Sequence, residues 1–203
     1  MKLNDETLRF IHEHCKDDVR NLALQAPKYP GVDMPVALTQ IAGRQAAAEK
    51  IPSWYAEEGI LYPRHLSLEQ CSSEATARYK ASIIPEFSSG TLADLTGGFG
   101  IDCAFLSPKF HHVTYVERQE VLCEIASHNF PLLALNHIRI ENKDAIRHLQ
   151  EMSSADWIFI DPARRDGHGG KTVAIADCKP NVAELESLQV GGQAVLGRQT
   201  SVT

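Results

Sequence analysis

Long hydrophobic runs are absent from this chain, and no apolar stretch exceeds a few residues. A helix that crosses a bilayer needs about 20 consecutive apolar residues, so the sequence predicts no membrane span and no membrane partner. The N-terminus, MKLNDETLRF, lacks the apolar segment of a secretory signal. The 5 cysteines are scattered without close pairs, which argues against a disulfide framework or a zinc knuckle. Together these absences favour a reducing cytoplasm.

An excess of positive charge is also missing, because the formal net charge is -6. A nucleic-acid substrate would therefore need a local basic patch or another domain to attract its phosphates. His12 and His14 lie two residues apart, which places them on different faces of a helix, and we predict no metal site. Hydrophobic residues make up 43% and charged residues 23% of the chain, which are globular values that exclude general disorder.

The pattern of the sequence changes near residue 85. Before it, apolar residues recur at steps of three and four, which predicts helices. The first such set predicts one helix face and consists of Leu8, Ile11, Cys15, Val19 and Leu22. Further helices are expected over 36–51 and 72–84, the latter capped by Ser72 or Ser73. We therefore expect an N-terminal helical domain over residues 1–84, with its apolar positions packed against a partner surface.

After residue 85, short apolar strands alternate with helices, which predicts an α/β fold with a parallel sheet and right-handed crossovers. The expected strands are 91–95, 113–117, 138–142 and 156–161, with 173–177 and 193–197 as further candidates. Helices are expected between them, and one more over 181–188. Residues 85–203 are thus predicted to form a second, Rossmann-like domain.

A glycine-rich loop follows the first of these strands and opens a helix. Its candidate binding residues are Asp94, Thr96, Gly97, Gly98, Gly100 and Asp102. Glycine lets the backbone approach a ligand closely, and the start of a helix offers free N–H groups. The dinucleotide pattern G-x-G-x-x-G fails, because its last glycine position holds Cys103. A carboxylate at the strand end suits a ligand with an ammonium group, so Asp94 argues against a pyrophosphate.

Three acidic residues end or follow the next strands. Glu117 lies roughly 20 residues beyond the loop, where an acidic side chain can take both hydroxyls of a ribose. Asp144 could accept a hydrogen bond from an adenine amino group, cap the following helix, or do both. Asp161 opens the segment Asp-Pro-Ala-Arg-Arg-Asp, in which Pro162 stiffens the turn and Arg164 suits a phosphate or carboxylate.

These motifs, from about residue 66 to residue 166, resemble class I S-adenosylmethionine (SAM)-dependent methyltransferases. DLTGGFGID looks like motif I of that family and DPAR like its motif IV. The resemblance implies that Glu117 is the ribose acid and Asp144 the adenine-side acid. The cofactor implied is SAM, with the glycine-rich loop as its site.

An RNA substrate, tRNA or rRNA, is implied by two finer resemblances. The segment EQCSSEATARYKA resembles the lead-in of trimethylguanosine synthases, and DPAR resembles the D-P-P-R of RNA 5-methyluridine methyltransferases. With its helical N-terminal part, the chain is similar to bacterial methyltransferases that carry a C-terminal THUMP-like RNA-binding domain.

Three features depart from the family. Ala163 replaces the second proline of motif IV and no aromatic residue follows, which weakens the case for methylation of a base amino group. Motif IV also contains no cysteine, and Cys178, farther along the chain, is more typical of a core residue than of a covalent nucleophile, so a covalent pyrimidine mechanism is unsupported. The glycine-rich C-terminus also supplies no closing hairpin, so we expect a C-terminally incomplete sheet.

The sequence therefore predicts a SAM-dependent methyltransferase that acts on RNA. Asp161 is the candidate that orients the nucleophile, Pro162 holds its turn rigid, and Arg164 grips the substrate. The alternative is a non-catalytic SAM- or RNA-binding module. An NAD-dependent oxidoreductase is disfavoured by the glycine spacing.

Overall fold

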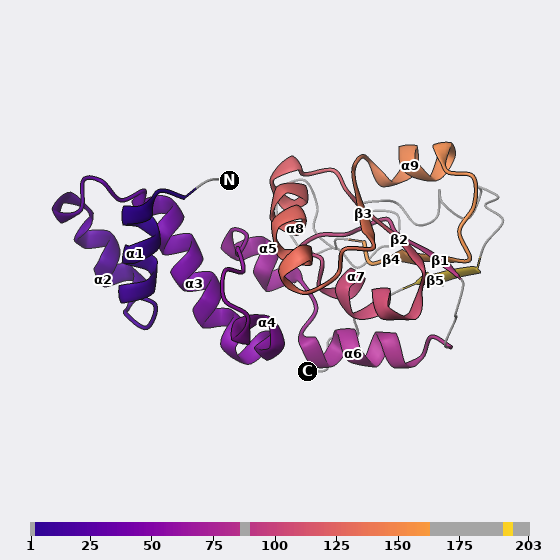
Figure 1. Cartoon of the computed structure of the whole chain (residues 1–203), viewed down its shortest axis with the longest axis horizontal. Coiled ribbons are helices and arrows are strands. Elements are labelled where there is room, and N and C mark those ends of the chain that lie inside the picture. Colours follow the sequence, from indigo (N-terminus) through magenta and orange to yellow (C-terminus); the bar gives the residue numbers. More distant parts are fainter. Residues whose placement is uncertain (1–2, 86–89, 163–192, 197–203) are drawn as a thin grey trace.

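The computed structural model describes residues 3–85, 90–162 and 193–196. Helices occupy the first part of the chain, and strands alternate with helices in the second (Figure 1). The α-helices are α1 (Asp5–Glu13), α2 (Val19–Leu24), α3 (Met34–Lys50), α4 (Pro52–Ala56), α5 (His65–Gln70), α6 (Glu74–Ser82), α7 (Ile101–Leu106), α8 (Glu120–Leu132) and α9 (Ala145–Glu151). Short 3-10 helices cover Ala26–Lys28 and Ser107–Lys109.

The strands form one parallel sheet with the spatial order β3-β2-β1-β4-β5. Their bounds are β1 (Thr91–Asp94), β2 (His112–Glu117), β3 (Ile138–Asn142), β4 (Trp157–Ile160) and β5 (Gln193–Leu196). The order reverses between β1 and β4, because the chain moves outward from β1 to β3 and returns to the other side of β1. This confirms the predicted Rossmann-like sheet and creates a switch point, where open α/β sheets bind ligands.

Alternating side chains of the strands build two cores, one on each face of the sheet. The first face carries Leu92, Val113, Tyr115, Trp157 and Phe159 and packs with buried residues of α6, α7 and α8. The second carries Ala93, Leu95, Val116, Ile158 and Ile160 and packs against α9. This alternation is what a period-two strand pattern requires when both faces are covered.

The first predicted helix is wrong, because residues 8–22 form two helices. Asp18 is the N-cap of α2, and its side chain accepts a hydrogen bond from the Asn21 backbone N–H. His14 Nδ1 and Asp17 Oδ2 lie 2.7 Å apart in the turn between the two helices. The charged segment 16–18 thus ends one helix and starts another, because an aspartate side chain competes for backbone N–H groups. Leu8, which was expected on the packed helix face, is half-exposed in α1.

The helical part of the chain contributes to two separate clusters of buried residues. Near the N-terminus, α1, α2 and the first half of α3 share a small core of Phe10, Leu22, Met34, Ala37 and Ile41. From Ala47 onward, buried residues of α3 to α6 belong to the same core as the first sheet face. Packing is therefore continuous across residue 84, and the division into domains at that position stays a prediction.

Several predicted features lie outside the described residues. These are the candidate strand 173–177, the expected helix 181–188, Cys178, and the motif IV residues after Pro162, which include Arg164. The candidate strand 193–197 is confirmed as β5, which pairs in parallel with β4. No helix within the described ranges is long and apolar enough to cross a membrane.

Candidate functional site at the sheet switch point

Three predicted acidic residues lie at the carboxyl ends of adjacent strands. Asp94 ends β1, Glu117 ends β2, and Asp161 directly follows β4. Each stands two residues beyond a side chain of the first sheet face, so strand alternation directs all three toward the face covered by α6, α7 and α8. The sequence thus brings its candidate carboxylates to one edge of the sheet, at the switch point.

The glycine-rich loop is anchored to both neighbouring strands. The Leu95 N–H donates to the Phe159 carbonyl at 3.0 Å, and the Gly97 N–H donates to the Val116 carbonyl at 2.9 Å. Gly98 has φ +55° and Gly100 φ +91°, a left-handed backbone that favours glycine. The loop is therefore fixed at the point where β1 separates from β2 and β4.

Close packing accounts for two of the loop glycines. A Cβ on Gly97 would lie 2.2 Å from Cε2 of Tyr115, and one on Gly100 would lie 2.9 Å from the Phe130 ring. The Tyr115 hydroxyl in turn donates to the Gly98 carbonyl at 2.6 Å. The absence of side chains thus lets the loop lie directly on the aromatic core, in addition to any role with a ligand.

Asp94 lies beneath this loop, only 1% exposed. Its Oδ1 accepts a hydrogen bond from the Thr96 N–H at 3.0 Å. Burial raises the pKa of Asp94 from 3.8 to about 8, so the carboxyl group is largely protonated at neutral pH. The predicted contact of Asp94 with a ligand ammonium stays a prediction, and in this structure its bonded partner is the loop itself.

Glu117 faces the same loop from β2. Its Oε2 accepts a hydrogen bond from the Gly98 N–H at 3.0 Å, and its Oε1 accepts one from the Gln119 N–H at 2.8 Å. A carboxylate offers about four acceptor positions, so two backbone bonds leave capacity for further donors. The carboxylate is therefore held in a defined orientation beside the glycine-rich loop.

Asp144 caps α9, which confirms one of its two predicted roles. Its Oδ1 accepts hydrogen bonds from the backbone N–H groups of Ile146 and Arg147 at 2.9 and 3.2 Å. The residue is exposed after β3, the strand that lies beside β2. Its predicted contact with an adenine stays a prediction.

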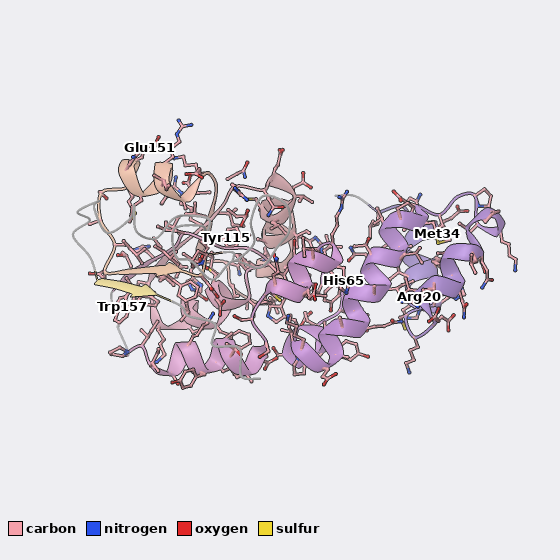
Figure 2. All side chains as sticks on the ribbon, turned by 180° about the vertical axis from the view of Figure 1, so that it is seen from behind. Arg20, Met34, His65, Tyr115, Glu151 and Trp157 are labelled. Atoms are coloured by element: carbon pink, nitrogen blue, oxygen red, sulfur yellow. The ribbon has the colours of Figure 1, made fainter. Side chains whose placement is uncertain are left out.

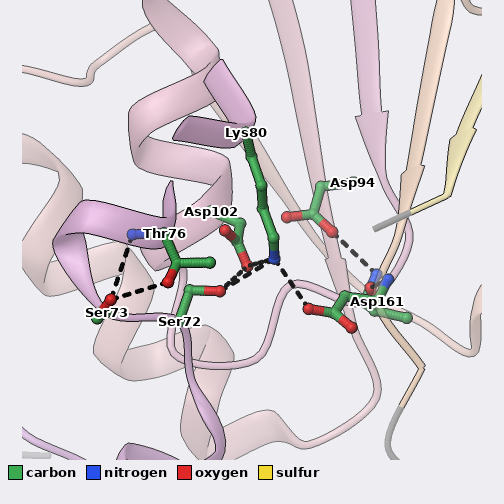
Figure 3. A network of polar contacts seen from close by, with 8 residues as sticks. Ser72, Ser73, Thr76, Lys80, Asp94, Asp102 and Asp161 are labelled. Atoms are coloured by element: carbon green, nitrogen blue, oxygen red, sulfur yellow. Dashed lines mark hydrogen bonds and ion pairs between the residues drawn. The ribbon is translucent and has the colours of Figure 1, made fainter. Parts of the chain in front are cut away.

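Asp161 is tied to the rest of the site through two different groups. Its backbone N–H donates to Thr96 Oγ1 at 2.7 Å, which joins the motif IV turn to the glycine-rich loop. Its side-chain Oδ2 accepts a hydrogen bond from Lys80 Nζ of α6 at 3.0 Å. Pro162 follows and is half-buried. The structure thus links the loop and the motif IV turn directly through Thr96. Figure 3 shows the second contact, between Asp161 and Lys80.

Lys80 is a buried cation that the sequence reasoning did not single out. Its Nζ donates to Ser72 Oγ, Asp102 Oδ2 and Asp161 Oδ2, each at 3.0 Å. Burial alone would lower the pKa of Lys80, but the neighbouring Asp102 and Asp161 outweigh it, and the net shift is upward. The ammonium group therefore stays charged between two carboxylates (Figure 3).

The two carboxylate oxygens of Asp102, in the first turn of α7, differ in their hydrogen bonding. Its Oδ2 is bonded to Lys80 and also accepts a hydrogen bond from the Ser72 hydroxyl at 2.8 Å. Its Oδ1 is buried, and the described part of the chain offers it no hydrogen-bond partner. A buried acceptor without a partner is costly, so it is suited to a donor that comes from a ligand.

Comparisons with known proteins support a fold but no family. No protein-family model and no curated protein matches this sequence. A crystal structure of a "putative methyltransferase" from Porphyromonas gingivalis aligns with a TM-score of 0.70 and 28% identity, over 92% of this chain. The alignment covers 47% of that protein, so the chain spans about half of its length.

Other solved structures align over smaller parts of the chain. The C-terminal domain of a precorrin-6Y methyltransferase from Rhodobacter capsulatus gives a TM-score of 0.48 at 18% identity, over 65% of this chain and 66% of that one. Trm5b from Pyrococcus abyssi gives 0.40 at 20% identity, over 46% and 28%. The parallel sheet and the first alignment show that the chain has the Rossmann-like methyltransferase fold.

Proposed function

We propose that this chain is a SAM-dependent methyltransferase that acts on RNA. The observation that supports it most is the bonding of Glu117 to Gly98, which joins the predicted ribose acid to the predicted SAM loop at the switch point. A coarse likeness to a methyltransferase fold over 92% of the chain supports the same conclusion. The RNA substrate rests on the resemblance of residues 69–81 and of DPAR to RNA methyltransferases.

The charge of the site fits a cationic cofactor. With Asp94 protonated, Lys80 carries one positive charge and Asp102 and Asp161 two negative ones, which leaves a net negative charge. Asp102 also holds the buried oxygen without a partner. SAM bears an ammonium and a sulfonium group, and cations of this kind are attracted by a buried negative cluster. A pyrophosphate would be repelled by it, which disfavours a dinucleotide.

In the proposed reaction, each part of the site has a separate task. SAM would supply a methyl group whose bond to the positively charged sulfur breaks as its bond to the RNA nucleophile forms, which leaves a neutral thioether. Glu117 and the loop would hold the cofactor, and Asp161 would orient the nucleophile. Positioning of this kind converts a bimolecular encounter into an oriented one, and exclusion of water adds to it.

Calorimetry with SAM, with its demethylated product and with NAD tests the cofactor. We expect binding of SAM and of its product but not of NAD. Replacement of Glu117 by Ala should weaken both by about 1.5–3 kcal/mol, the scale of hydrogen bonds to a charged group, because both ligands carry the same ribose. Glu141→Ala is the matched control, since Glu141 also lies near the end of its strand but pairs with Arg139 and Lys143.

Transfer of labelled methyl groups from SAM to unmodified RNA tests the reaction. Label incorporated by the wild-type chain supports the proposal. Binding of SAM without transfer to any RNA would instead support the non-catalytic module, and equal affinity of Glu117→Ala and the wild type would remove the assignment of the ribose acid.

A further inference from the structure

Lys80 joins elements that are far apart in the sequence at the candidate site. It projects from α6 and is only 8% exposed, yet its ammonium group contacts no backbone acceptor in the described residues. Its acceptors are a serine hydroxyl and the carboxylates of Asp102 in α7 and Asp161 after β4. The Nζ atom also lies 5.1 Å from the centre of the Phe159 ring.

Lys50, a second partly buried lysine, makes contacts that are purely structural. Lys50, near the end of α3, donates to the backbone carbonyls of Leu68 and Glu69 at 2.9 and 2.7 Å. These bonds tie α3 to α5 and involve no ionised partner. Lys80 differs because it brings together two carboxylates that would otherwise repel each other in a buried place.

Other ionisable groups of the described residues lie near the ion pairs of Lys80. Asp94 of β1 is largely neutral because burial raises its pKa to about 8. The thiols of Cys71 and Cys103 are neutral as well, because burial raises the pKa of each. Among the described residues, Lys80 forms ion pairs with Asp102 and with Asp161. Its positive charge therefore acts directly on the charge state of Asp161.

Two bonds fix the turn that carries Asp161. The backbone N–H is held by Thr96 of the loop, and the carboxylate is held by Lys80 of α6. The first bond sets the position of the turn, and the second sets the orientation of the side chain. Removal of the second bond would keep the Asp161 backbone in place, and its carboxylate would lose the adjacent cation that favours the ionised form.

We propose that Lys80 is a positioning residue that keeps the Asp161 carboxylate ionised and in one orientation for methyl transfer. The inference rests on the proposed function, because it assigns Lys80 a task in the same site. It predicts that Lys80 acts on the transfer step through Asp161 and leaves the binding of SAM unchanged. No contact between Lys80 and SAM or RNA is required.

Lys80→Met is the principal test, with Lys50→Met as the matched control. Single-turnover transfer from saturating SAM to unmodified RNA should slow about 100-fold in Lys80→Met, the cost of a misplaced reacting group. SAM affinity by calorimetry should stay the same, because one carboxylate takes up a proton when the lysine charge is lost. Lys50→Met should lose stability and keep its transfer rate.

Carboxyl carbon NMR gives a readout that does not depend on activity. Aspartate carboxyl groups are labelled with carbon-13 and titrated, and the Asp161 signal is assigned with Asp161→Asn. In Lys80→Met the titration midpoint of Asp161 should move to higher pH, because an adjacent positive charge has been removed. In Lys50→Met it should stay where it is in the wild type.

A double variant covers the case in which Lys80→Met does not fold. Lys80→Met/Asp102→Asn removes one charge of each sign, which relieves the repulsion between the carboxylates. Transfer by this folded variant that is slower than transfer by Asp102→Asn alone supports the proposal, and equal transfer by the two overturns it. An unchanged midpoint of Asp161 in Lys80→Met overturns it as well. If the wild type transfers no methyl group to RNA, the proposed function fails, and the titration still decides whether Lys80 holds Asp161 ionised.

Discussion

The position of Asp94 could be predicted from the sequence, but the protonation state of its carboxyl group could not. A carboxylate at the end of a strand, before a glycine loop, indicates a ligand contact. In the structure the side chain is buried, and its Oδ1 accepts a hydrogen bond from the loop N–H of Thr96. Burial favours the neutral form, and the two carboxylates of Asp102 and Asp161 add to this effect. Asp94 thus supports the loop as a protonated acid.

Replacement of Asp94 by Asn should make stability less dependent on pH. The pKa of Asp94 is about 8 in the folded chain and 3.8 in the unfolded one. Below pH 3.8 its neutral side chain therefore makes its full contribution to the free energy of unfolding. This stabilisation is then lost as pH rises toward 8, by on the order of 1 kcal/mol for each pH unit, because only the unfolded state ionises. Asn keeps the acceptor oxygen for Thr96 and removes this loss.

Denaturant unfolding of both proteins at pH 5, 6 and 7 measures the effect. The free energy of unfolding of the wild type should fall relative to that of Asp94→Asn at each step. Parallel pH curves for the two proteins would show that Asp94 is ionised in the folded state.

Lys80 shows what residue patterns miss. Its neighbours Ala77, Ala81 and Ile84 are buried and recur at helical spacing, which places position 80 beside the buried stripe of α6. A lysine at such a position usually keeps its charged group in solvent and buries only its aliphatic stem. The neighbouring sequence does not indicate which residues Lys80 contacts. Those partners are Asp102 and Asp161, 22 and 81 residues away. Only the folded sheet brings them together.

Among the elements, the connection from β1 to α7 is where glycine is most strictly required. Gly100 is the N-cap of α7, with φ +91°, and a Cβ there would press against Phe130. Gly59 also has a positive φ, +85°, but a Cβ there would meet only Leu132 Cδ1, at 3.5 Å. Substitution at Gly100 would therefore cause both backbone strain and overpacking, whereas substitution at Gly59 would cause backbone strain alone.

Gly100→Ala should lower the free energy of unfolding by about 2–4 kcal/mol, the sum of left-handed strain and overpacking against Phe130. Gly59→Ala should cost about 1–2 kcal/mol, because only the strain applies. Denaturant unfolding of both variants measures the two costs. Equal losses in the two variants would mean that the contact with Phe130 is relieved at no cost.

Strands were easier to predict than helix boundaries. The strands expected over 91–95, 113–117, 138–142 and 156–161 differ from β1 to β4 by no more than one residue at either end. They are buried apolar runs between turn signals, which leave few alternatives. The helices of the first part are short, and their ends depend on side-chain caps. The cap at Asp18 split one predicted helix, and the short helix α5 was not predicted.

Over the whole molecule, the chain is elongated, with α1 to α3 at one end and the sheet at the other (Figure 1). Met34 and Arg20 lie at the helical end, whereas Tyr115 and Trp157 lie with the sheet (Figure 2). The small core around Phe10 and the main core share no residue. The helix α3 belongs to both, since Ile41 lies in one and Ala47 in the other.

The main core connects α4 directly to the candidate site. Trp54 of α4 packs edge-on against Phe99 of the glycine-rich loop, with ring centres 5.0 Å apart. Phe10 packs in the same way against Tyr29 at 4.8 Å, within the small core. Both side chains are almost completely buried, so they form a matched pair of aromatic residues in different cores.

Trp54→Ala should therefore lower both stability and SAM affinity, whereas Phe10→Ala should lower stability alone. Loss of either large aromatic side chain should cost about 3–5 kcal/mol. The loss of Trp54 also removes the support beneath Phe99, so the loop between β1 and α7 can shift. Denaturant unfolding and calorimetry with SAM on both variants measure the two effects. If Phe10→Ala weakened SAM binding as much as Trp54→Ala in folded protein, the two cores would be coupled through α3, and the loop would not depend on Trp54 in particular.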